Sequence, residues 1–120
     1  MKMGSPAETV VRDLAAAFPS LQPLMDGHID DYDEVLPHVF LGDVHRYVAD
    51  TLNGDDDASA SDVQGIIDFL EDRFRRGEDT VRELISVSFV ELLPRPGERG
   101  AHVRTMLGPE LSAEARRVGE

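Results

Sequence analysis

The sequence predicts an all-α fold, a compact bundle of about five to six short helices. Apolar residues recur at spacings of three and four along most of the chain, and capping residues precede several of these stretches. No alternating strand pattern of useful length occurs, and the one β-like run, residues 85–90, also carries a helical stripe. At this length we expect a single all-α domain over residues 1–120, frayed at 1–4 and 112–120.

Three helices are predicted in the first half of the chain. The first spans 5–18: a Ser-Pro-Ala-Glu capping box opens it, and Pro19 ends it. A short second helix is expected over 21–28 and a third over 37–52, which an Asn-Gly pair stops. The acidic stretch 30–34 is predicted to be the loop between the second and third helices.

The second half begins with a predicted polar linker, residues 55–60. A second capping box then opens a helix over 61–76, and another helix, apolar on nearly all sides, is expected over 80–93. A helix over 98–107 and a weak last helix from Pro109 complete the prediction. The residues expected to be mostly buried are Phe18, Phe40, Leu41, Val44, Val48, Ile67, Leu70, Leu84, Ile85 and Phe89.

The charge is concentrated in one part of the chain. Between Asp26 and Asp57 lie ten acidic residues and one basic residue, Arg46, so this stretch carries −9 of the formal charge of −12. A concentrated negative surface favours a basic protein partner and repels nucleic acid and anionic membranes. The alternative interpretation is that the acidity serves solubility, as in proteins of halophiles.

Other features narrow the class of protein. The chain has no cysteine, which excludes disulfides and cysteine zinc sites and fits a cytoplasmic protein. The sequence contains no run of 18 apolar residues, so no membrane span is predicted. A serine elbow, a glycine-rich phosphate loop and an HExxH motif are all missing, so we expect a non-enzymatic protein. Two carboxylates and a histidine, such as Asp31, His38 and Asp43, could perform acid–base catalysis. Such sets occur by chance in a chain this rich in acidic residues.

Metal binding is the rival hypothesis. A metal-binding protein or metal-dependent enzyme would use His28, His38 and His45 with nearby aspartates. However, His38 and His45 are seven residues apart, about 10 Å along a helix, which is too far for a simple shared site. A calcium-like loop that starts at Asn53 lacks the glycine at its sixth position and the glutamate at its twelfth, which is Gln64. We therefore expect no metal and no cofactor.

The predicted partner-binding residues lie in the acidic third of the chain. Tyr32, flanked by carboxylates, can supply a desolvated hot spot inside a charged rim; alternatively its ring packs against Leu36 or the second helix. The whole predicted set is Asp30, Asp31, Tyr32, Asp33, Glu34, His38 and Asp43.

Three strings together resemble a family. They are Leu36-Pro37-His38 followed by Gly42-Asp43, then the run 87–93, then the run 107–111. Their order and spacing are similar to those of small, uncharacterised bacterial helical proteins that look like polymorphic-toxin immunity proteins. The resemblance implies an all-helical cytoplasmic immunity protein, and it implies no catalytic residue. Independently of it, the acidic surface suits a basic, nuclease-like toxin domain, because a nuclease needs a positive surface to hold phosphates. A self-associating helical adaptor is a third possibility for the sequence.

Overall fold

The computed structural model describes residues 6–52, 57–98 and 101–118, and every regular element in these ranges is helical. The all-α prediction is confirmed. The α-helices are α1 (Pro6–Ala17), α2 (Gln22–Tyr32), α3 (Pro37–Leu52), α4 (Asp57–Arg76), α5 (Asp79–Ser88) and α6 (Pro109–Val118). The short 3-10 helices are η1 (Pro19–Leu21), η2 (Val90–Leu92) and η3 (Ala101–Met106).

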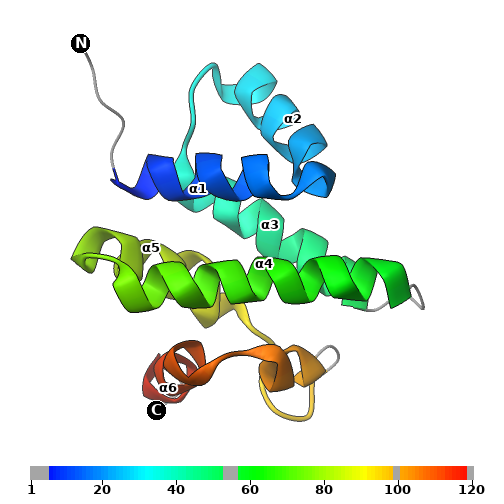
Figure 1. Ribbon diagram of the computed structural model, residues 1–120, viewed down its shortest axis with the longest axis vertical. Coiled ribbons are helices and arrows are strands. Elements are labelled where there is room, and N and C mark those ends of the chain that lie inside the picture. The colour runs from blue at the N-terminus through cyan, green and yellow to red at the C-terminus, as the bar shows by residue number, and fades with distance from the viewer. Residues whose placement is uncertain (1–5, 53–56, 99–100, 119–120) are drawn as a thin grey trace.

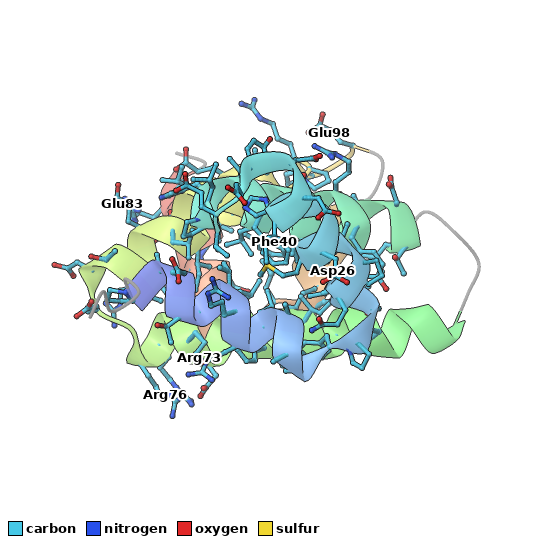
Figure 2. The ribbon with its side chains drawn as sticks, turned by 90° about the horizontal axis from the view of Figure 1, so that it is seen from above. Asp26, Phe40, Arg73, Arg76, Glu83 and Glu98 are labelled. Atoms are coloured by element: carbon cyan, nitrogen blue, oxygen red, sulfur yellow. The ribbon has the colours of Figure 1, made fainter. Side chains whose placement is uncertain are left out.

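The core lies where α3 packs directly against α5, with α1 and α4 covering the pair. Phe40 of α3 and Leu84 and Ile85 of α5 are fully buried. Figure 2 shows Phe40 inside the molecule, whereas the labelled charged side chains Arg76 and Glu83 point outward. Burial of apolar side chains is the main force that holds such a bundle together. It contributes roughly 25 cal/mol for each Å² of apolar surface removed from water.

The two helices farthest apart are α2 and α6. The molecule measures 47 × 31 × 20 Å along its principal axes. Figure 1 shows α2 near one end of the long axis and α6 near the other, with α1, α3, α4 and α5 between them. Surfaces built on α2 and on α6 are therefore separate surfaces.

The predicted core is confirmed except at Phe18. The other nine residues predicted to be buried are buried. Phe18 is half-buried, with its ring edge-on to Phe69 at a centroid distance of 6.2 Å. Its ring also lies over Gly65, where an added Cβ would come within 2.8 Å of the ring. The absence of a side chain at Gly65 lets Phe18 reach α4.

The predicted loop over 30–34 is wrong in its first half, because α2 continues through Tyr32. The helix ends at Asp33, which adopts a left-handed conformation (φ 58°) and donates its backbone N–H to the Ile29 carbonyl at 2.7 Å. Aspartate tolerates this conformation better than most residues with a Cβ. Consequently Asp30 and Asp31 project from a helix rather than from a loop.

The predicted start of the fourth helix at Ser61 is also wrong. Helix α4 begins at Asp57, so most of the expected linker is helical. The sequence of this stretch contains two alanines, which favour helix, and this preference explains the extension. Residues 53–56, which are the first four positions of the calcium-like loop, lie outside the described residues.

The fifth helix is shorter than predicted. Helix α5 ends at Ser88, and Phe89 breaks the helical geometry before η2 begins. The break leaves Val90 and Leu93 buried but Leu92 48% exposed, although a continuous helix would place Leu92 on the stripe with Phe89. The free energy gained by burying Val90 and Leu93 thus exceeds the stabilisation that further turns of the helix would give.

The C-terminal part differs from the prediction in two ways. The helix expected over 98–107 is the 3-10 helix η3, and residues 112–118, expected to fray, belong to α6. Two contacts account for the order of α6. Leu111 is fully buried, and the Glu71 carboxylate of α4 accepts hydrogen bonds from the backbone N–H groups of Glu110 and Leu111, both at 2.9 Å. Glu71 thereby caps α6 from another helix.

Candidate functional site

An open groove of about 590 Å³ lies between α2 and α3. Its lining from α2 is Pro23, Leu24, Gly27, His28, Asp31 and Tyr32, and its lining from α3 is Asp43, Arg46, Tyr47 and Asp50. Both helices contribute residues at spacings of three and four, which places them on one face of each helix. We call this surface the acidic groove.

The acidic groove carries more negative than positive charge. Its lining contains three carboxylates, of Asp31, Asp43 and Asp50, against the guanidinium of Arg46. Arg46 pairs with Asp43 at 3.3 Å, whereas Asp31 and Asp50 are exposed and form no ion pair with a described residue. Charges of one sign in a concave surface focus the potential and attract the opposite charge.

His28 is the buried polar residue of the acidic groove. It is only 3% exposed, and its Nε2 accepts a hydrogen bond from the Leu36 backbone N–H at 2.8 Å. A neutral imidazole has one donor and one acceptor, so Nδ1 carries the proton. Among the described residues Nδ1 has no hydrogen-bond partner. An unpaired buried donor costs roughly 1–3 kcal/mol, so this one calls for an explanation.

The two tyrosines of the groove differ in burial and in hydrogen bonding. Tyr47 is half-buried and donates its hydroxyl to Asp62 at 3.0 Å, and Ser20 also donates to that carboxylate. Tyr32 is 46% exposed, and its ring rests on His28 with a centroid distance of 4.9 Å. Tyr32 therefore packs on the second helix, as one interpretation predicted, and still presents much of its ring to solvent.

The predicted partner-binding residues separate into two groups. Asp31, Tyr32 and Asp43 line the acidic groove. Asp30, Asp33, Glu34 and His38 are exposed but do not line it. The Nδ1 atom of His38 hydrogen-bonds to the Ser88 hydroxyl of α5 at 2.6 Å. Asp31, His38 and Asp43 therefore do not meet in the groove as an acid–base set.

Seven lining residues of the groove are not in the predicted partner-binding set: Pro23, Leu24, Gly27, His28, Arg46, Tyr47 and Asp50. A signal was present. Asp43, Arg46, Tyr47 and Asp50 lie at positions i, i+3, i+4 and i+7 of one helix, which predicts a shared polar face. Gly27 could not be predicted, because its contribution is an absent side chain facing the groove.

The histidines of the metal hypothesis have separate partners. His28 bonds to Leu36, His38 bonds to Ser88, and His45 lies edge-on to Phe89 with a centroid distance of 5.6 Å. Burial, and secondarily the charge of Arg46, lowers the pKa of His45. No group of three histidine or acidic side chains within residues 6–52, 57–98 and 101–118 is placed to hold a metal ion.

The later positions of the calcium-like loop, residues 57–64, lie in α4. Its first positions lie outside the described residues. Gln64, at the twelfth position, donates its amide to Asp68 at 2.8 Å and to the Met106 carbonyl at 3.0 Å. This side chain links α4 to η3.

The fold and groove define an all-helical protein with an acidic concave surface and no assembled catalytic set in the part of the chain that the structure describes. The domain of unknown function DUF7674 matches residues 11–119, so the chain belongs to that family. No curated protein and no solved structure matches the chain. None of the described helices is both long and apolar enough to cross a membrane.

The family match bears on the resemblance noted from the sequence. It supports a small helical protein of uncharacterised function over nearly the whole chain. Nothing in the match links the family to immunity proteins. The partner therefore has to be inferred from the chemistry of the surface.

Proposed function

We propose that this protein is a non-enzymatic binding protein whose acidic groove takes a basic segment of a partner protein. The observation that carries the proposal is that Asp31, Asp43 and Asp50 line one groove together with the exposed Tyr32. The preferred partner is a basic, nuclease-like toxin domain, which needs a positive surface to hold phosphates. An inhibitor of such a domain gains association rate by presenting the opposite potential.

Tyr32 supplies the apolar part of the contact. Tyrosine is enriched among hot-spot residues because its ring buries a large area with little loss of side-chain entropy. With 46% of Tyr32 exposed, a partner can still cover much of the residue. Two charges of the same lining, Asp31 and Asp50, have no ion pair with a described residue and are available to arginine or lysine.

His28 adds a hydrogen-bond donor to the groove. Its Nδ1–H is buried without a partner among the described residues, and the Tyr32 ring packs against the imidazole at a tilt. When that ring turns aside, a carbonyl of the bound segment can accept the hydrogen bond. In this proposal the cost of the unpaired donor in the free protein is recovered on binding.

The first test uses the neighbouring reading frame. We expect the gene beside this one to encode a long secreted protein with a basic C-terminal domain, and that domain to bind this chain directly. Reversing Asp31, Asp43 and Asp50 to Lys should slow association at least tenfold at low salt, measured by stopped-flow fluorescence. The wild-type rate should fall steeply between 0.05 and 0.3 M salt, because a Debye length of about 10 Å at 0.1 M screens exposed charges.

A matched control reverses three carboxylates outside the groove, in α2 and in the segment that follows it. Reversing Asp26, Asp30 and Glu34, which are exposed and do not line the groove, shifts the net charge equally. It should slow association far less. Equal slowing by both triple variants would mean that net charge alone attracts the partner, and the groove would not be the site.

A second test blocks the groove without changing charge. Gly27 lines the groove and Gly42 does not, and both have open space where a Cβ would stand. Gly27→Gln should weaken binding at least tenfold, and Gly42→Gln should leave it unchanged. Unchanged binding by folded Gly27→Gln would contradict the proposal.

A further inference from the structure

A second groove, of about 530 Å³, lies at the α6 end of the molecule. Three arginines from different segments reach it: Arg95 after η2, Arg104 of η3 and Arg116 of α6. The groove is also lined by Glu91 and Pro96, and its apolar lining is Val90, Leu93, Ala115 and Val118. We call it the arginine groove.

The arginines of this groove differ from the other arginines of the described residues. Six others pair with carboxylates: Arg12, Arg46, Arg73, Arg75, Arg76 and Arg117. Arg82 donates to two backbone carbonyls of the α4 end and lies near the Phe74 ring. Arg95, Arg104 and Arg116 have no ion pair with a described residue. Among the described arginines, four therefore have no ion pair with a described residue, and three of these four line one groove, whereas Arg82 lies outside it.

One of the three is held in place. Arg104 is half-buried, and its Nε donates to the Pro94 carbonyl at 2.6 Å. This bond uses one of its five N–H donors, and the others remain for a ligand. Arg95 and Arg116 are exposed at the same groove and can approach from its rim. Arginine binds carboxylates with two parallel hydrogen bonds, which a fixed guanidinium favours.

From this geometry we propose that the arginine groove binds an extended acidic peptide segment of another protein, with carboxylates on the guanidiniums and one aliphatic side chain on the apolar lining. Val90, Leu93 and Ala115 are already buried, and the half-buried Val118 is the apolar lining residue that an aliphatic side chain can cover. The lining carries three positive charges against the one negative charge of Glu91. This site is separate from the acidic groove and does not depend on the function proposed for it.

Other occupants fit less well. A nucleic acid would meet a molecule of net charge −12 and the Glu91 carboxylate in the lining. A second copy could offer its acidic groove, but two concave surfaces cannot fill one another. An extended peptide is narrow enough to enter the groove and carries the required charges on alternate side chains.

The test uses a fluorescein-labelled peptide, Glu-Asp-Leu-Glu-Asp, with blocked termini, and measures fluorescence anisotropy with the full chain. The variant Arg95→Gln plus Arg116→Gln should weaken binding at least tenfold while Arg104 keeps its backbone contact. The matched control, Arg12→Gln plus Arg75→Gln, removes the same charge from paired arginines outside the groove and should leave binding within twofold. A peptide with Gln in place of every acid should not bind.

Three outcomes would overturn the proposal. The first is equal weakening by the groove variant and its control, which would indicate general attraction between charges. The second is equal competition by sulfate at the concentration of the peptide, which would indicate an anion site without a peptide groove. The third is wild-type self-association in sedimentation that the groove variant abolishes, which would make a second copy the occupant. Retention of the wild-type melting temperature by both variants shows that lost binding is not lost folding.

Discussion

The acidic groove and the arginine groove are of similar volume, and they differ in charge, in chemistry and in how they are assembled. The first is lined by two helices that follow one another in the chain, and it contains both tyrosines of the protein. The second is lined by residues of η2, η3 and α6 and by the segment after η2, with aliphatic side chains in place of aromatic ones.

The contacts that hold α2 and α6 also differ, because one joins residues close in the sequence and the other joins distant ones. Helix α2 is tied to the next turn of chain by His28 and Leu36, eight residues apart. Helix α6 is capped by Glu71, which lies 39 and 40 residues from its two partners. One groove therefore depends on local contacts next to the core, and the other depends on a distant carboxylate. We expect the two grooves to respond differently to single substitutions.

The largest effect is expected where both grooves depend on the same core. Phe40 is fully buried in α3, and its ring meets His28 edge-on at 5.7 Å. Phe40→Ala should lower the free energy of unfolding by about 3–5 kcal/mol, through lost burial and the cavity that remains. Urea unfolding followed by circular dichroism measures this change. A loss below about 1 kcal/mol would show that Phe40 is not central to the fold.

A smaller effect should separate the two grooves. Glu71→Ala removes the acceptor for two N–H groups at the start of α6, and we expect a loss of about 2 kcal/mol. Hydrogen exchange should show faster exchange in α6 with little change in α2. Binding of the acidic peptide should weaken, while binding at the acidic groove is retained. Glu83→Ala, at an exposed site of α5, is the control and should do neither.

A gain in stability is expected in the wall of the acidic groove. Gly27 lies within α2, and nothing stands within 4 Å of the place where its Cβ would be. Gly27→Ala should therefore stabilise the protein by roughly 0.5–1 kcal/mol, because alanine favours helix more than glycine does. Gly42→Ala in α3 should stabilise similarly. By contrast, Gly65→Ala should destabilise, since its Cβ would collide with the Phe18 ring.

The smallest effect concerns pH. A hydrogen bond from Arg117 is the main cause that lowers the pKa of Glu114, which also accepts the Ser86 hydroxyl at 2.6 Å. A lowered folded-state pKa stabilises the protein above the ordinary glutamate value of 4.5, and this contribution is lost as the pH falls through the folded-state value. Glu114→Gln should therefore lose less stability than the wild type when the pH falls from 5 to 3. Parallel pH profiles would contradict this role.

Much of the fold could be predicted from local sequence. Helix α3 has the predicted bounds, and α1 and α4 end within a residue of prediction, because their apolar stripes and stop signals lie within each helix. The errors fall where distant packing overrides local preference. Leu92 belongs to an apolar stripe, yet burial of Val90 and Leu93 breaks the helix before it.

The sequence by itself determined the all-α fold class, most of the residues that are buried in the core and the concentration of carboxylates between Asp26 and Asp57. It even contained the spacing that aligns Asp43, Tyr47 and Asp50, since a helix turns this local pattern into one face. Tertiary structure alone decided which carboxylates share a groove. It likewise decided that Arg95, Arg104 and Arg116 meet. Their side chains belong to separate elements, and only the packing of those elements into one core brings them together.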